Sequence, residues 1–180
     1  SDVNKLRQLT GAGMMDCKKA LVEANGDFEG AIDYLRKKGA KVAASRQDRE
    51  SNEGVVIAKT SADNKKGIII ELNCETDFVS ANEAFVALAN DIAKAAAENN
   101  VDSLDALKAL PYGEATIQDA ITALIAKLGE NMNLRRYEKL EAPAGLVSSY
   151  IHMGGKIGVL VQVDAENPSQ EVSSVAKDVA

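Results

Sequence analysis

Apolar side chains recur every three or four positions through residues 1–40, which is the period of an amphipathic α-helix. The pattern predicts three short helices, over 2–9, 15–24 and 28–38. Residues that commonly cap helices mark their starts and ends: Asp2, Asp27, Gly11, Gly26 and Gly39. Three helices of this length form a bundle near the smallest size that folds without disulfides or metals.

Beyond Gly54 the pattern changes to that of strands. β-branched runs occupy 55–60 and 68–74, and the polar residues 62–67 between them predict a hairpin. A further strand is indicated over 132–140, where apolar and polar residues alternate.

Helical periodicity returns between the second and third of these strands. A capping-box pattern at Ser80 predicts the start of one helix. Its apolar stripe consists of Phe85, Leu88, Ala89, Ile92, Ala93 and Ala96. Two shorter helices are predicted over 103–110 and 117–128, the second capped by Thr116.

The pattern of residues 54–70 is repeated loosely at 145–161, in the order strand, polar turn, strand, helix. The helix of the second copy follows Asn167-Pro168 and reaches Ala180 without a capping signal. This ending indicates a truncated second copy or a pairing partner, and a homo-oligomer is one form of such pairing. The predicted fold class is α+β, with two related hairpin-plus-helix subdomains in the core.

Composition is that of a globular chain, because 46% of its 180 residues are hydrophobic. No apolar run approaches the ~18–20 residues that cross a bilayer, and no cationic leader precedes an apolar segment. Cys17 and Cys74 lie in unrelated contexts, as free thiols of a reducing compartment do. We therefore expect a cytoplasmic protein with no membrane partner.

Charge is distributed unevenly along the chain. Residues 1–49 hold ten Lys and Arg against seven Asp and Glu, a net charge of +3, whereas the remainder holds eleven against twenty, a net charge of -9. The acidic remainder would be repelled by phosphates, so no direct nucleic-acid binding is expected.

Enzymatic chemistry has little support in the sequence. His152 is the single histidine, and neither cysteine has ligands at zinc spacing, so we expect no metal site. The glycine-rich stretches at 11–13 and 154–156 do not match a phosphate-binding loop, and no catalytic pair stands out. We therefore expect no cofactor and no enzyme, and a small-molecule enzyme is the weakest hypothesis.

Phe78 follows the second strand in the sequence Glu75-Thr76-Asp77-Phe78-Val79 and has two interpretations. Phe28 and Phe85 have apolar partners at helical spacing, as core aromatics do, but Phe78 has none. Large aromatics are usually buried, which favours a ring folded under its own turn. The alternative is an anchor that enters another protein.

Two other positions leave a structural and an interface role open. Met14 and Met15 follow a glycine turn, flanked by Arg7 and Lys18, and flexible thioethers suit adaptable protein contacts, although at least one methionine is expected to fill the small core. His152 precedes a glycine turn, where it either bonds to local backbone or contacts a partner.

Four stretches together resemble the bacterial-type translation elongation factor Ts family, in family order and over most of the chain. They are TGAGMMDCKKAL from Thr10, NCETDFV from Asn73, Gly129-Glu130-Asn131 with Arg135-Arg136, and SSYIHMGGKIGVLV from Ser148. The resemblance implies a UBA-like three-helix module at 1–40, a charged linker at 41–53, a core subdomain at 54–141 and the incomplete start of a second at 142–180. Longer family members continue past the position of Ala180.

The same resemblance implies a guanine-nucleotide exchange factor whose partner is elongation factor Tu. Thr76, Asp77, Phe78 and Val79 match the segment that dislodges Mg²⁺ from the partner's nucleotide site, with the aromatic ring as a wedge. Further partner contacts are implied at Leu128, Gly129 and His152 in the core and at Arg7, Met14, Met15 and Lys18 in the N-terminal module. The competing hypothesis is that the bundle is a ubiquitin-type or nascent-chain-type adaptor and the remainder a scaffold.

Overall fold

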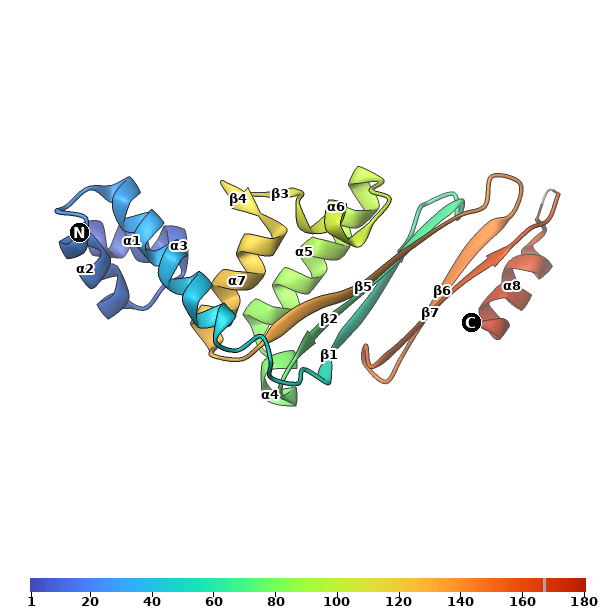
Figure 1. Cartoon of the computed structure of the whole chain (residues 1–180). Helices are drawn as coiled ribbons and strands as arrows, with labels where there is room; N and C mark the ends of the chain where they lie inside the picture. The colour runs from blue at the N-terminus through green and yellow to red at the C-terminus, as the bar shows by residue number, and fades with distance from the viewer. Residues whose placement is uncertain (167) are drawn as a thin grey trace.

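The N-terminal part of the chain is a three-helix bundle (Figure 1). The computed structural model describes residues 1–166 and 168–180. Helices α1 (Asp2–Thr10), α2 (Met14–Glu23) and α3 (Phe28–Ala44) confirm the three predicted helices. Their small core is formed by Leu6, Cys17, Ala20 and Ala31.

Two of the predicted helix boundaries in the bundle are wrong. The N-cap of α1 is Ser1 rather than Asp2, and α3 runs past Gly39 to Ala44. Gly39 is buried where α3 packs against α7 (Ile117–Leu128), and a Cβ added to it would lie 3.5 Å from that of Ala126. The glycine therefore marks a close helix contact instead of a helix end. Asp27 caps α3 as predicted, accepting a 2.8 Å hydrogen bond from the Gly30 amide.

The central sheet is antiparallel and has the order β1-β2-β5. Strands β1 (Glu53–Thr60) and β2 (Lys66–Cys74) form the predicted hairpin, and β5 (Met132–Glu141) is the predicted third strand. Side chains alternate across β2, so Ile68, Ile70, Leu72 and Cys74 enter the main core on one face.

Helices cover that face of the sheet. In α5 (Glu83–Asn99) all six residues of the predicted apolar stripe are buried, and α7 adds Ile117, Ile121, Leu124 and Ile125. Thr116 forms a full capping box with Asp119, but the predicted cap at Ser80 is wrong because Asn82 caps α5. Ser80 ends a separate one-turn helix, α4 (Asp77–Ser80).

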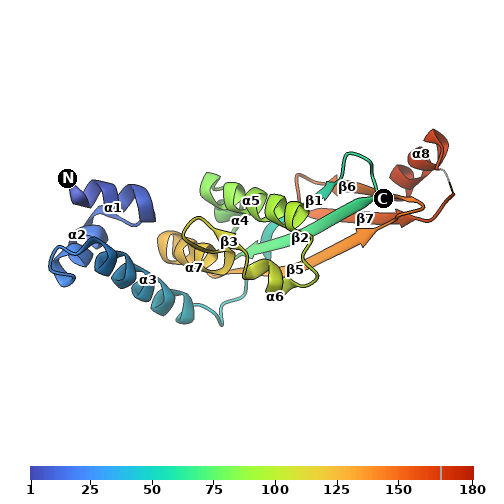
Figure 2. The same ribbon diagram turned by 90° about the horizontal axis from the view of Figure 1, so that it is seen from above.

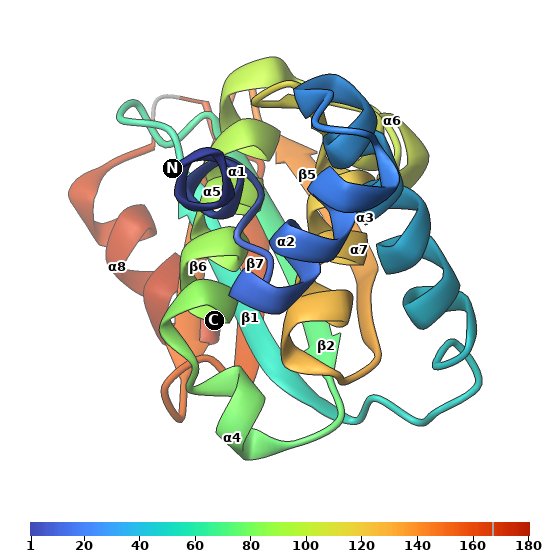
Figure 3. The ribbon, with the colours of Figure 1, turned by 90° about the vertical axis from the view of Figure 1, so that its left-hand side faces the viewer.

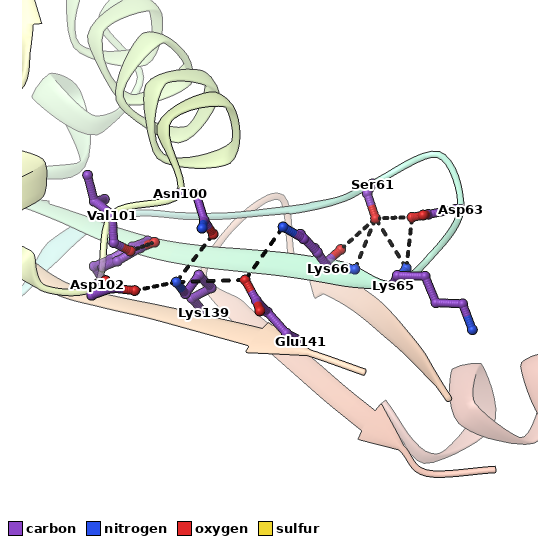
Figure 4. A network of polar contacts seen from close by, with 10 residues as sticks. Ser61, Asp63, Lys65, Lys66, Asn100, Val101, Asp102, Lys139 and Glu141 are labelled. Atoms are coloured by element: carbon purple, nitrogen blue, oxygen red, sulfur yellow. Dashed lines mark hydrogen bonds and ion pairs between the residues drawn. The ribbon is translucent and has the colours of Figure 1, made fainter. Parts of the chain in front are cut away.

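Short elements connect α5 to α7 and are tied to the sheet. Helix α6 (Leu104–Lys108) lies within the predicted 103–110, and the two-residue strands β3 (Pro111–Tyr112) and β4 (Ala115–Thr116) form an unpredicted ladder. The turn before α6 is anchored by Lys139 of β5, whose Nζ contacts Asp102 at 2.5 Å and Asn100 at 3.3 Å (Figure 4).

The opposite face of the central sheet is covered by a second hairpin, β6 (Leu146–His152) with β7 (Ile157–Val163). The two hairpins pack closely, since a Cβ added to Gly158 would lie 2.5 Å from Val56 Cγ1. Helix α8 (Gln170–Val179) packs on this second hairpin. Of its predicted apolar stripe only Ala176 is buried, while Val175 and Val179 are exposed. The prediction at Asn167, before this helix, lies outside the described residues.

The elements form a layered α+β structure, which confirms the predicted class. Helices α5 and α7, the sheet β1-β2-β5, the hairpin β6–β7 and α8 follow one another across the molecule, with the three-helix bundle at the far end from α8 (Figures 1 and 2). None of the helices formed by residues 1–166 and 168–180 combines the length and the hydropathy of a membrane span. The division into the four ranges given above stays a prediction.

Candidate functional site

Phe78 lies on the single helical turn α4, directly after the central strand β2. Its side chain is 85% exposed, so the ring is not folded under its own turn and that interpretation is wrong. Asp77 beside it is also exposed, whereas Val79 is buried in the main core. The turn therefore presents an acid and an aromatic ring outward while its next residue holds it to the core.

Thr76 fixes the start of this turn. Its hydroxyl accepts a 3.4 Å hydrogen bond from the Val79 amide, which is an N-cap. The same hydroxyl donates to Glu130 Oε1 at 2.6 Å, and Glu130 Oε2 accepts the amides of Glu75 and Thr76 at 3.1 and 3.0 Å. One carboxylate thus satisfies three donors at the end of β2.

The Glu75 side chain binds the residue that follows Glu130. Its Oε1 accepts a 2.6 Å hydrogen bond from the Asn131 amide, and its Oε2 lies 3.6 Å from Arg49 Nη1. The Asn131 side chain donates to the backbone carbonyl of Arg49 at 2.7 Å and to that of Gln47 at 3.4 Å. The segment that follows α3 is thereby joined to the turn that carries Phe78.

Cys74 lies under the turn as an inert thiol. It donates a 3.2 Å hydrogen bond to the Thr76 carbonyl, and burial, helped by the nearby Glu130 charge, raises the pKa of the thiol to about 12. Cys17 is buried in the bundle, and both cysteines are free. A raised pKa is the opposite of what Cys74 would need as a nucleophilic or redox-active thiol.

Leu128 and Gly129 lie beside this turn, because they immediately precede Glu130. Leu128 ends α7 and packs partly against the main core, and Gly129 terminates that helix with φ 79°. Such a backbone conformation strains any residue with a Cβ, so glycine suits the position. The structure therefore places Leu128 and Gly129 directly before the carboxylate that binds Thr76 at the start of the turn.

His152 lies at the turn of the β6–β7 hairpin and is exposed. Its carbonyl accepts a 3.2 Å hydrogen bond from the Gly155 amide, while its ring Nδ1 lies 3.0 Å from the Tyr150 hydroxyl. The hairpin tip is fixed to β1, since the Val56 amide donates to the Gly155 carbonyl at 2.7 Å. Figures 1 and 3 show this tip and α4 at the same edge of the molecule.

The N-terminal candidates lie on the bundle, apart from α4. Met14 and Met15 are 54% and 75% exposed, so the prediction that one of them fills the bundle core is wrong. Lys18 is exposed on the same helix. Arg7 lines a hollow of about 500 Å³ between α1 and the end of α7, together with Lys127.

Sequence reasoning missed the two carboxylates that hold the turn. Glu75 and Glu130 lie within the motifs quoted above, but the sequence pattern predicts no role for them. Their signal is present, because each is an acid next to a strand end where backbone amides have no ladder partner. Among the described residues, no three His, Cys, Asp or Glu side chains gather as they would around a metal ion.

Comparison with known proteins gives consistent matches. The family model described as "Elongation factor TS" matches residues 75–180. Similar curated proteins include "Elongation factor Ts" of Clostridium acetobutylicum, 53% identical over 99% of this chain, and that of Clostridium perfringens strain SM101, 51% identical over 98%. A third, from Clostridium botulinum strain Okra, is 52% identical over 99%. The chain covers 59% of the length of each of these relatives.

Proposed function

Because the chain belongs to the elongation factor Ts family, we propose that it is a guanine-nucleotide exchange factor for elongation factor Tu in the cytoplasm. It binds the GDP-bound partner, displaces Mg²⁺ and promotes GDP release during translation elongation. In this proposal the bundle is the UBA-like module, and the two hairpin-plus-helix units are related core subdomains. No covalent step is involved.

The observation that carries the proposal is the 85% exposure of Phe78 on a turn that is fixed by the buried Val79 and by hydrogen bonds to Glu130. An exposed benzyl ring has no stabilising role within its own chain, since its apolar area stays in water. A rigid mounting lowers the entropy lost when the ring enters a partner. Buried aromatic rings are frequent energetic hot spots of interfaces.

The energy that exchange requires supports an aromatic anchor over an ion pair. Shifting the ratio of nucleotide-releasing to nucleotide-holding partner from 1:99 to 99:1 takes about 5.5 kcal/mol of differential affinity for the two states. A surface ion pair contributes ~0–1 kcal/mol, whereas a hot-spot anchor contributes ~2–4 kcal/mol. Phe78 together with a second contact region is therefore sufficient.

Asp77 complements the ring in this mechanism. Mg²⁺ neutralises charge on the nucleotide phosphates, so its removal weakens GDP binding electrostatically. An exposed carboxylate next to the wedge perturbs the surroundings of the metal in the partner. Binding of the factor and of GDP then oppose each other by the same coupling free energy in both directions.

The remaining candidates supply the second contact region. Met14, Met15, Arg7 and Lys18 present exposed thioethers and cations on the bundle. His152 lies at the hairpin tip, next to the exposed Met153 and beyond the turn from Ile157. Flexible sulfur-containing side chains suit an adaptable protein surface.

The test is release of a fluorescent GDP analogue from elongation factor Tu, followed by stopped flow with and without this chain. We expect faster release and a stoichiometric nucleotide-free complex in native mass spectrometry. Unchanged release without a complex would contradict the proposal. A parallel pull-down that retains ubiquitin and not elongation factor Tu would favour the adaptor hypothesis.

A further inference from the structure

The side chains of Glu75 and Glu130 each accept hydrogen bonds from backbone at or next to the other glutamate, an arrangement that we call the carboxylate latch. The Glu130 side chain accepts from the backbone of residues 75 and 76, and the Glu75 side chain accepts from the backbone of Asn131. We infer that the latch positions the turn carrying Phe78 for entry into the partner. This inference rests on the proposed function, and both glutamates are positioning residues within it.

The turn needs such support because it is too short to be stable alone. Helix α4 has four residues, and an isolated helix of that length does not form in water. Its cap depends on the Thr76 hydroxyl, which accepts from the Val79 amide only if its proton points elsewhere. Glu130 Oε1, 2.6 Å away, accepts that proton and so orients the hydroxyl.

The two negative charges of the latch are compensated by the groups around them. Three of the four carboxylate oxygens of the latch accept hydrogen bonds, and the fourth, Glu75 Oε2, lies 3.6 Å from Arg49 Nη1. Hydrogen bonds to a charged acceptor are stronger than those between neutral groups. Removing such donors from a part-buried carboxylate costs more free energy than removing them from an exposed one. The latch therefore holds the turn in one conformation.

The latch also joins the two contact regions. Asn131 donates an amide to Glu75 and two side-chain hydrogen bonds to the carbonyls of Gln47 and Arg49. These carbonyls belong to the segment leading back to α3 and the bundle. Fixing the turn and this segment to the same residue keeps Phe78 and the bundle in one arrangement before the partner binds.

The direct test is amide hydrogen exchange of Glu75, Thr76 and Val79 in Glu130→Ala. We expect exchange at these amides to become about tenfold faster or more, because their acceptor or their cap is lost. Glu138→Ala is the matched control, since Glu138 is an exposed glutamate of β5, the strand that begins two residues after Glu130. Unchanged protection in Glu130→Ala overturns the inference. If that variant does not fold, Glu130→Gln, which keeps one acceptor oxygen, is measured by the same criterion.

A double-mutant cycle then separates positioning from general stability. Glu130→Ala should slow GDP release from elongation factor Tu about tenfold in the parent but have little effect in Phe78→Ala, because the latch acts through that ring. Equal slowing in both backgrounds overturns the positioning role. Unchanged release in Phe78→Ala itself, with protection of the Glu75, Thr76 and Val79 amides lost in Glu130→Ala, contradicts the proposed function, whereas the structural part of the inference, that the latch holds the turn, then stands.

Discussion

Phe78 and Val79 are neighbours in the chain with opposite environments. Val79 is 9% exposed in the main core, and Phe78 is 85% exposed. Residue-type statistics favour burial of both side chains, and the sequence does not reveal which of two adjacent apolar residues faces inward. Which side chain faces inward depends on how α4 is rotated about its axis. The Thr76 hydroxyl caps the helix, and Glu130, from a distant part of the chain, accepts a hydrogen bond from that hydroxyl.

The two neighbours should respond oppositely to truncation. We expect Val79→Ala to lower the free energy of unfolding by about 2 kcal/mol, because buried methyl groups are removed. Phe78→Ala should change it by less than about 0.5 kcal/mol, as surface substitutions do. Urea unfolding followed by circular dichroism measures both. A larger loss for Phe78→Ala than for Val79→Ala would mean that the ring is part of the core.

Helices and strands were predictable wherever a long periodic pattern exists. The stripe of α5, the hairpin β1–β2 and the cap at Thr116 all follow from local sequence. Boundaries that depend on tertiary contact were not predictable. At Gly39 the glycine predicts a helix end, but in the structure it allows α3 to pack closely on α7. Likewise nothing local predicts that the second hairpin packs face to face on the first.

Two glycine substitutions test this packing with opposite signs. Gly39→Ala should stabilise the chain by about 0.5–1 kcal/mol, since the added Cβ makes an ordinary 3.5 Å contact and the helix gains propensity. Gly158→Ala should destabilise it by about 1–3 kcal/mol, since its Cβ would lie 2.5 Å from Val56 Cγ1. Thermal unfolding of both variants provides the measurement. The same sign for both would contradict the layer arrangement.

The whole molecule holds its two candidate contact regions on separate parts of one frame. The bundle carries Met14 and Met15, and the edge of the central sheet carries Phe78 and the tip with His152. Packing of α3 on α7 and the bonds of Asn131 connect these parts. Under the proposed function, separate regions allow one to supply affinity while the other perturbs the nucleotide site of the partner.

This division of roles predicts a split between affinity and rate. We expect Met14→Ala with Met15→Ala to weaken binding to elongation factor Tu about tenfold, or ~1.4 kcal/mol, without changing the limiting rate of GDP release. Val22→Ala, which removes another exposed apolar side chain of α2, serves as the control. Titrated stopped-flow experiments give both quantities. A reduced limiting rate with unchanged affinity would reverse the assignment.

The most direct measurement of the central claim compares Phe78→Ala with Val175→Ala, which truncates an exposed apolar residue of α8 at the far side of the molecule. The limiting rate of release of a fluorescent GDP analogue from elongation factor Tu is measured by stopped flow at saturating factor. We expect Phe78→Ala to reduce this rate at least about thirtyfold, equivalent to about 2 kcal/mol, and Val175→Ala to leave it unchanged. A Phe78→Ala protein that binds fully and releases GDP at the parent rate would contradict the account.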